Sequence, residues 1–399
     1  MEIRDNLMEK NLTISARDDL YHAKTYARQP LVITSGKGSL VYDENGKEYI
    51  DLSSGIAVNT FGVADDEWVA AVNEQLGKVQ HMSNLFYTEP VANLAAALCA
   101  KTGMKRAFFC NSGAEANECA IKAARKYSQD KYGKERYKII TLVNSFHGRT
   151  MATLTATGQD VFHNDFTPML DGFYYAAAGD VETIKSYVEK GDVAAIMFEI
   201  VQGEGGVMPL EKNFVSGLAE IAKQNDILLI CDEVQCGNGR CGKYFAYELY
   251  DINPDIVTTA KGLGGGLPIG ATLFSEKTNE VLTPSTHGST FGGNPISCAA
   301  ALNVVNRIDD ELLAEVTRKG EYIKETLKGK EGIKSVSGLG LMLGIETVKA
   351  AGDVLKICRD NGVIVITAKT KVRLLPPLNI PWPLLEKAIE VIIDACKEN

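Results

Sequence analysis

Two short apolar runs, residues 227–231 and 256–260, constrain this chain more than any other feature. Runs of this length and composition are typical of strands buried on both faces, as in a parallel sheet covered by helices. The first run is followed by Asp232 and the second by Lys261, so each strand is predicted to end at a charged residue. Because the carboxyl ends of parallel strands meet at one edge of a sheet, the acid and the lysine are predicted to lie close together.

An acid and a lysine at one sheet edge suit a pyridoxal phosphate site, in which a lysine binds the cofactor covalently and a carboxylate holds the pyridinium proton. Taken alone, Asp232 would more commonly cap a helix and Lys261 would be a solvated loop residue. The glycine-rich residues 262–266 favour the cofactor site, because glycines let the backbone pass close to a flat ligand. A surface lysine has no such need.

The composition limits the classes of partner. The chain has 399 residues, of which 45% are hydrophobic, and this is enough for one large domain with a smaller one. A net charge of -9 and a pI near 5.3 argue against nucleic acid or an anionic membrane as the main partner. With neither a signal-like start nor a run of about 20 apolar residues, a cytoplasmic protein is expected. The nine cysteines include no C-x2-C pair, so reduced thiols and no metal site are expected.

The order of the predicted elements indicates an α/β fold. Strands alternate with helices from about residue 105 to 270, which predicts a mostly parallel sheet covered by helices on both faces. Before this region, a helical start and a hairpin with a turn at 36–38 are expected. A turn-rich hinge near residue 290 precedes an α+β pattern. The predicted divisions are an N-terminal segment, 1–60, that packs with the small domain, a large cofactor-binding domain, 61–290, and a small C-terminal domain, 291–399.

A strand, a turn of small residues and a helix follow one another at residues 106–127. Free N–H groups at such a helix start, together with the helix dipole, suit a phosphate. An ordinary capped helix is the alternative, and the absence of the P-loop pattern argues against a nucleoside triphosphate.

Three further residues follow strand ends. Phe146 could stack on a flat cofactor, Arg149 could hold a carboxylate through two hydrogen bonds, and Glu204 lies between glycines. Taken singly, they would more commonly be a core residue, a surface ion pair and a solvated loop acid.

Together these features resemble the class III pyridoxal phosphate-dependent aminotransferases. The resemblance covers nearly the whole chain and keeps the family's order of motifs, which are NSGAEAN at 111–117, FHGR at 146–149, DEVQ at 232–235, GR at 239–240, AKGLGGG at 260–266 and STFGGNP at 289–295. It implies a fold type I transferase, α/β with a mostly parallel central sheet and a smaller α+β domain, and pyridoxal 5'-phosphate as the cofactor.

The resemblance also implies a role for each residue of the site. Lys261 resembles the lysine that forms the Schiff base and moves the substrate proton, and Asp232 resembles the partner of the pyridinium nitrogen. Gln235 would bind the ring oxygen, and Phe146 would stack on the ring. A homodimer with shared active sites is expected, because Thr290 resembles a residue that reaches the cofactor phosphate of the other subunit. The remaining phosphate contacts would come from Ser112, Gly113 and Ala114.

An aminotransferase of this class must accept two different acids in turn. Arg149 resembles the residue that binds the distal carboxylate, and Arg373 resembles the one that binds the α-carboxylate of glutamate. Glu204 resembles an acid that pairs with Arg373 until glutamate arrives, and Ser289 is expected to contact substrate.

The identity of the amino donor is predicted from two further segments. SSGIAVN at 53–59 and SNLFY at 83–87 are most similar to class members that transfer the amino group of N2-acetylornithine to 2-oxoglutarate, in arginine biosynthesis. Ornithine, succinylornithine and 4-aminobutyrate aminotransferases are the alternatives within the class.

Other classes of protein fit the residues less well. A non-catalytic protein on the same fold would need none of Lys261, Asp232 and Arg149. A Rossmann-type protein would need G-x-G-x-x-G at the start of a helix, whereas residues 262–266 are GLGGG. The chain departs from the family pattern at Val63, Cys241 and Ser337, outside the predicted chemistry.

Overall fold

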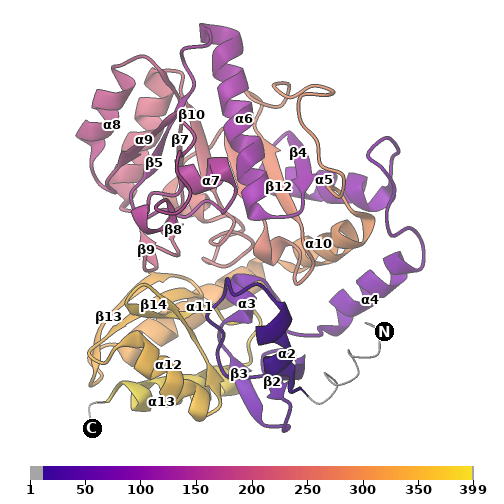
Figure 1. Ribbon diagram of the computed structural model, residues 1–399, viewed down its shortest axis with the longest axis vertical. Coiled ribbons are helices and arrows are strands. Elements are labelled where there is room, and N and C mark those ends of the chain that lie inside the picture. The colour runs from indigo at the N-terminus through magenta and orange to yellow at the C-terminus, as the bar shows by residue number, and fades with distance from the viewer. Residues whose placement is uncertain (1–11, 398–399) are drawn as a thin grey trace.

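The computed structural model describes residues 12–397. The chain forms two units, one above the other in Figure 1, and the N-terminal strands lie beside the C-terminal elements in the lower one. The larger unit is built on a seven-stranded sheet. Its strands, in order across the sheet, are β4 (Arg106–Cys110), β12 (Gly270–Phe274), β11 (Ile256–Thr259), β10 (Leu228–Asp232), β7 (Val193–Phe198), β5 (Lys138–Leu142) and β6 (Phe173–Ala176).

The sheet is mostly parallel, as predicted. Only β12 runs antiparallel to its neighbours, β11 and β4, while the pairs from β11 to β6 are parallel. Every residue of β7 and β10 is buried. Burial on both faces explains why these strands are apolar without alternation, and it confirms the predicted α/β fold.

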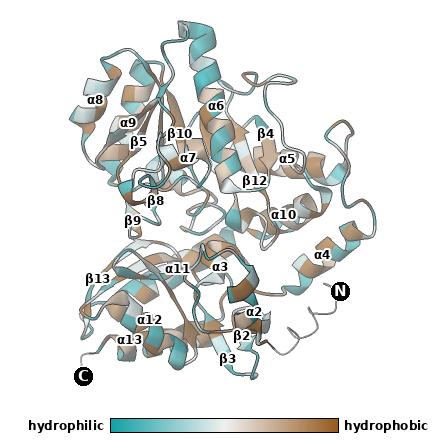
Figure 2. Cartoon of the chain, viewed as in Figure 1, coloured by the Kyte–Doolittle hydropathy of each residue, from teal (hydrophilic) through white to brown (hydrophobic). Residues whose placement is uncertain are grey.

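Alternation along each strand directs side chains into two layers of helices. Leu228 and Ile230 pack with residues of α6 (Gly113–Tyr132), whereas Leu229 and Cys231 lie in the cluster that contains α9 (Lys212–Gln224). Figure 2 shows hydrophobic residues on the strands and a hydrophilic outer end of α6. The other elements of this unit are α4 (Asp66–Leu76), α5 (Glu89–Thr102), α7 (Met151–Ala156), α8 (Val181–Val188), α10 (Pro295–Arg307), the hairpin β8 (Val201–Gln202) and β9 (Met208–Pro209), and the 3-10 turns η2 (Asp160–Phe162), η3 (Ala246–Tyr250) and η4 (Lys261–Leu263).

The smaller unit joins the two ends of the described chain. Ile50 and Leu52 belong to a core otherwise formed by residues beyond 312, and β3 pairs in parallel with β15. One sheet has the order β1 (Ile33–Lys37), β2 (Leu40–Asp43), β3 (Glu48–Asp51) and β15 (Val363–Ile364), and the other the order β13 (Ile333–Leu339), β14 (Met342–Thr347), β17 (Lys371–Leu374) and β16 (Ile366–Ala368). The helices are α2 (Ile14–Tyr21), α3 (Ser54–Ala57), α11 (Asp310–Leu327), α12 (Ala351–Asp360) and α13 (Trp382–Cys396).

Helix α10 bears on the expected boundary at residue 290. Its buried residues, among them Cys298, Ala301 and Val304, lie in the core of the larger unit, where the helix packs against α4 and α5. A hinge-like sequence marks a turn and does not reveal which core the next helix joins. We therefore propose that the C-terminal unit begins after Ile308 and not at residue 291.

Smaller differences concern the ends of the chain and its turns. The described N-terminal helix ends at Tyr21, and the expected helical residues 1–11 lie outside the described part. The predicted turn at 36–38 is displaced, because β1 continues to Lys37. Between residues 12 and 397, no helix is both long and apolar enough to cross a membrane.

Candidate active site

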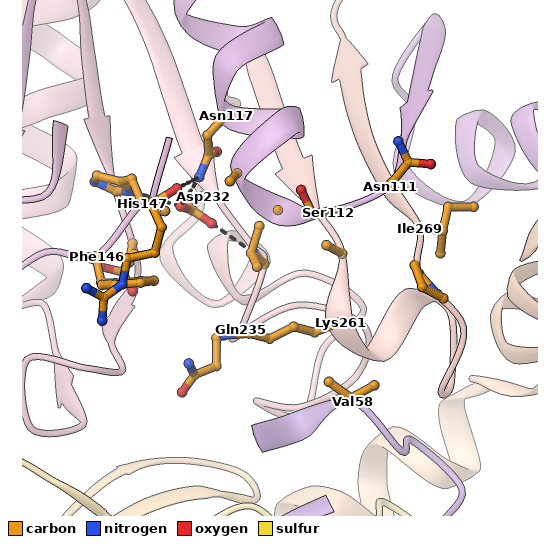
Figure 3. Close-up of a pocket in the computed structure, with 18 of the residues that line it drawn as sticks. Val58, Asn111, Ser112, Asn117, Phe146, His147, Asp232, Gln235, Lys261 and Ile269 are labelled. Atoms are coloured by element: carbon orange, nitrogen blue, oxygen red, sulfur yellow. Dashed lines mark hydrogen bonds and ion pairs between the residues drawn. The ribbon is translucent and has the colours of Figure 1, made fainter. Parts of the chain in front are cut away.

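Asp232 and Lys261 reach the same cavity from neighbouring strands. Asp232 is the last residue of β10, its Cα pairs with that of Thr258 on β11, and Lys261 follows three residues later. The cavity has a volume of about 610 Å³, and both side chains line it. Figure 3 shows Lys261 and Asp232 entering this space from adjoining segments. The predicted meeting of an acid and a lysine at one sheet edge is therefore observed.

The glycine-rich loop after Lys261 is packed closely against other parts of the chain, and its Gly266 lines the cavity. A Cβ on Gly265 would lie 2.8 Å from Trp68 Nε1, and one on Gly264 would overlap the Leu267 carbonyl. The loop is fixed by hydrogen bonds to the carbonyls of Gly262 and Gly264 from Thr60 and Trp68. These glycines pack against protein atoms and shape the turn that presents Lys261. Burial lowers the pKa of Lys261, which favours the uncharged amine that proton transfer requires.

Asp232 is held by a complete set of donors. Its Oδ2 accepts a hydrogen bond from Asn117 Nδ2 at 2.8 Å and lies 2.8 Å from His147 Nδ1, while Oδ1 accepts from the Val234 N–H at 3.0 Å. Thr258 Oγ1 donates to Asn117 Oδ1 at 2.6 Å and so fixes the orientation of the amide. Asp232 is 2% exposed. A carboxylate supported in this way keeps its direction, and it can hold a positive charge in the cavity.

Three further residues support the site, two of them within the sequence motifs. Besides Asn117, these are His147 and Glu199, which are buried beside Asp232 and also line the cavity. Burial disfavours the charged imidazole, but the hydrogen bond and charge of Asp232 outweigh it, so the pKa of His147 is raised. Burial raises the pKa of Glu199 to about 7, and Glu199 Oε1 accepts the Phe146 N–H at 2.9 Å. The sequence signals for them are the motif positions of Asn117 and His147 and the position of Glu199 directly after an apolar strand.

The start of α6 forms the expected cradle for an anion. Ser112 is the N-cap and accepts the Glu115 N–H at 3.2 Å, and Gly113 and Ala114 begin the helix beside the cavity. First-turn N–H groups have no acceptor within a helix, so they and the dipole attract negative charge. A Cβ on Gly113 would lie 2.6 Å from Val234 Cγ1, which explains why glycine occupies this position.

Phe146 and Arg149 lie on another wall of the cavity. The Phe146 ring meets Phe162 edge to face at 5.8 Å, and the Arg149 guanidinium lies 4.3 Å from the centre of the Phe162 ring. Arg149 is exposed, and within residues 12–397 it forms no ion pair. It is therefore free to bind a carboxylate.

Arg373 is masked, in contrast to Arg149. Its Nη1 donates to Glu204 Oε1 at 2.6 Å and to Gln235 Oε1 at 3.1 Å, and Arg373 is only 3% exposed. Burial opposes the charge of Glu204, but Arg373 outweighs this effect and the pKa of Glu204 is lowered. The amide of Gln235, which also lines the cavity, thus contacts the arginine.

Ser289 and Thr290 lie outside the lining of the cavity as the described chain forms it. Ser289 Oγ accepts hydrogen bonds from Asn111 Nδ2 and from the Gly292 N–H, at 3.2 and 3.1 Å, and Thr290 is exposed. A single chain therefore does not test their expected contacts with substrate and with the cofactor of another subunit.

The residues present fit pyridoxal phosphate. The cavity combines a buried carboxylate for a pyridinium, an aromatic wall, a lysine with a lowered pKa and a helix start for a phosphate. The glycine at position 113 keeps the helix start close to Val234, where a larger residue would collide. Among residues 12–397, no cluster of metal-ligating side chains accompanies them.

The chain belongs to the class III aminotransferases, because the family Aminotransferase class-III matches residues 21–396. These enzymes use pyridoxal 5'-phosphate, which is described at the active site of an ornithine aminotransferase from Toxoplasma gondii that is similar to this chain, with a TM-score of 0.92 at 31% identity over 99% of this chain and 96% of that one.

Within this family, the chain is similar to several acetylornithine aminotransferases. The chain is 50% identical to the acetylornithine aminotransferase of Haemophilus ducreyi, over 96% of this chain and 98% of the relative, and 45% identical to that of Aquifex aeolicus, over 93% and 98%. It is also similar to the structure of N-acetylornithine aminotransferase from Stenotrophomonas maltophilia, with a TM-score of 0.82 and 36% identity over 95% and 98% of the two chains.

Proposed function

We propose that this enzyme transfers the amino group of N2-acetylornithine to 2-oxoglutarate, forming N-acetylglutamate 5-semialdehyde and glutamate in arginine biosynthesis. The observation that carries the proposal is the contrast between two arginines near one lysine. Arg149 is open, whereas Arg373 is masked by Glu204. This arrangement suits two kinds of substrate. One has a single carboxylate, which binds to Arg149, and the other has two carboxylates, which bind to Arg149 and Arg373. The names of the relatives, acetylornithine aminotransferases, support this donor.

The remaining residues have proposed roles around the cofactor. When bound, pyridoxal phosphate supplies the electron-withdrawing ring on which an amino group can be exchanged. Lys261 would hold it covalently and move the proton at the substrate carbon, for which its lowered pKa is favourable. Asp232 would keep the ring nitrogen protonated, and Phe146 would pack against the ring. Ser112, Gly113 and Ala114 would bind the phosphate, and Gln235 would reach the ring oxygen.

Glu204 would act as a switch between the two substrates. A buried arginine without a partner is costly, so Glu204 pairs with Arg373 while the donor is bound. Glutamate or 2-oxoglutarate would displace Glu204 and place its α-carboxylate on Arg373, with the other carboxylate on Arg149.

A homodimer with shared active sites is part of the proposal. Large apolar side chains are exposed beside Ser289, where Asn84 donates to the Ser289 carbonyl at 3.2 Å. These side chains are Met82, Leu85, Phe86, Tyr87 and Phe291, and Tyr87 is fully exposed. A second copy would bury this surface, bring Thr290 to the phosphate of its partner and allow Ser289 to contact substrate. A cytoplasmic location is also proposed, and the nine free cysteines are consistent with it.

The test is a set of half-reactions with the purified enzyme and its cofactor. N2-acetylornithine, ornithine, succinylornithine, 4-aminobutyrate and glutamate are mixed separately with the enzyme, and the absorbance of the cofactor is followed. We expect rapid conversion by N2-acetylornithine and glutamate and slow conversion by the others. Faster conversion by ornithine, succinylornithine or 4-aminobutyrate would replace the proposed donor, and no conversion by any of them would reject the proposed activity.

A further inference from the structure

A second cavity lies beside Glu204, and the Glu204 side chain could enter it when the proposed switch opens. It has a volume of about 580 Å³ and is distinct from the one that contains Lys261. The residues that line it include Glu204, Phe162, Asn144, Asp160 and Lys369. Phe162 is also the ring on which Arg149 lies, so this cavity adjoins both proposed carboxylate sites.

Among the described residues that line this second cavity, Lys369 is the one cation. Its Nζ donates to Asn144 Oδ1, a neutral acceptor. In the part of the chain from 12 to 397, Lys369 takes part in no ion pair within 4 Å, while Glu204 is paired with Arg373. Lys369 thus brings a positive charge to the cavity. Its present partner is the neutral amide of Asn144, which a carboxylate could replace.

The backbone ties Lys369 to the Arg373 site. Lys369 has a φ of +51° in the turn between β16 and β17, and Arg373 lies on β17, where its Cα pairs with that of Ile366. Arg373 Nη2 also donates to the Thr367 carbonyl at 3.3 Å, within the same hairpin. Lys371, between the two cations, donates instead to Ser337 Oγ at 2.8 Å. Lys369, which lines the cavity with Glu204, and Arg373, which pairs with Glu204, therefore belong to one hairpin.

Glu204 is also close to the present partner of Lys369. A Cβ on Gly205, the next residue, would lie 2.6 Å from the Asn144 carbonyl oxygen, so only glycine allows this approach. The Glu204 side chain is 28% exposed, in contrast to 3% for Arg373, and has room to turn. A carboxylate that leaves Arg373 keeps its charge, and Lys369 in the same cavity offers the opposite charge.

We propose that Lys369 receives the Glu204 carboxylate when the α-carboxylate of glutamate or 2-oxoglutarate occupies Arg373. This inference rests on the proposed function and specifies where the switch goes when it opens. Glu204 exchanges Arg373 for Lys369, and Asn144 releases Lys369. Lys369 is then a specificity-determining residue that favours the dicarboxylic substrate without touching it.

The test compares Lys369→Met with Lys369→Arg, and with Lys356→Met as a matched loss of charge at an exposed lysine on α12. Each enzyme is loaded with cofactor, and single half-reactions are followed with N2-acetylornithine and with glutamate. Because a partly exposed ion pair is worth little, Lys369→Met should weaken glutamate binding about two- to fivefold and affect the donor less. Lys369→Arg should stay close to the wild type, and so should Lys356→Met.

The same substitution on a Glu204→Gln background gives the decisive comparison. Without the negative charge at 204, loss of Lys369 should have no further effect on glutamate. An equal effect on both half-reactions, or an undiminished effect in the double variant, would overturn the proposal for Lys369. A wild-type enzyme that converts neither substrate would instead reject the proposed function, and with it the open state of the switch.

Discussion

Asp232 and Glu204 are two acids near Lys261, and the structure holds them in different ways. Asp232 accepts hydrogen bonds from Asn117, His147 and Val234, which belong to three segments of the larger unit. Glu204 is held by side chains alone, chiefly Arg373 of the smaller unit. One carboxylate is fixed from several directions, and the other depends chiefly on Arg373, a partner that a substrate can replace.

The difference shows how one site can combine constant chemistry with a changing substrate. A charge that must always face the cofactor is best held by several buried donors that a substrate does not reach. A charge that must leave is best held by a cation that the substrate also needs. The contrast leads to four predictions, which follow in order of the expected effect.

The largest effect is expected for Lys261, which serves both substrates. Lys261→Met should lower turnover by at least about 10³-fold with either amino donor, because no other described lysine lines the cavity and general acid–base catalysis is lost. Steady-state assays would measure this, with Lys356→Met as the control and circular dichroism as the test of folding. Activity within tenfold of the wild type would exclude Lys261 from the chemistry.

Replacement of the fixed acid should affect both half-reactions alike. Asp232→Asn keeps the approximate shape but removes the charge, so we expect a loss of about 10²- to 10³-fold with N2-acetylornithine and with glutamate. Rapid-mixing measurements of the two half-reactions provide the comparison. A loss confined to one substrate would show that Asp232 is not the constant element of the site.

Replacement of the exchangeable acid should separate the two substrates. Glu204→Gln removes the charge that competes for Arg373, so the preference for glutamate over N2-acetylornithine should rise about tenfold. The ratio of the two half-reaction rates at low substrate concentration is the measurement. Unchanged rates for both substrates would contradict the switch.

The smallest effect concerns stability at a third acid, Glu233, which adjoins Asp232 in sequence. Burial raises the pKa of Glu233 to about 7, although the N–H groups of Ala246 and Tyr247 lower it in part. Because its pKa is higher in the folded state than in the unfolded state, its protonated form adds stability below pH 4.5, and this stability is lost as the pH rises through about 7.

The corresponding experiment follows unfolding by denaturant at several pH values. Between pH 5 and 8, the free energy of unfolding of the wild type should fall by up to about 2 kcal/mol. The free energy of unfolding of Glu233→Gln should change less with pH, because glutamine does not titrate. Activity should not track this change, since Glu233 does not line the cavity. Identical pH profiles for the two proteins would show that Glu233 titrates normally.

Much of this arrangement could be predicted from the sequence, because burial on both faces leaves a distinctive apolar strand. The runs before Asp232 and Lys261 therefore located the sheet edge, within one residue for β10. The sequence indicates no role for Asn117 and His147, because their hydrogen bonds depend on α6 and the segment after β5 both lying beside the end of β10. Helix α10 was assigned to the C-terminal unit, because amphipathic residues show that a helix is buried but not against which core.

Lys369 illustrates a further limit of sequence analysis. A lysine in a polar turn has the composition of an ordinary solvated loop. Its relation to Glu204 follows only from the hairpin that carries Arg373 and from the cavity that both side chains line.

The pairing of β3 with β15 has a consequence for how the chain is made. The Lys47 amino group donates to the Asp360 carbonyl at 2.9 Å across 313 residues, so this sheet cannot close until synthesis has passed Ile364. During translation, the apolar side chains of Ile50 and Leu52 therefore stay exposed to solvent while the central sheet is completed. Termination before β15 would therefore leave β1, β2 and β3 without their core and prone to aggregation.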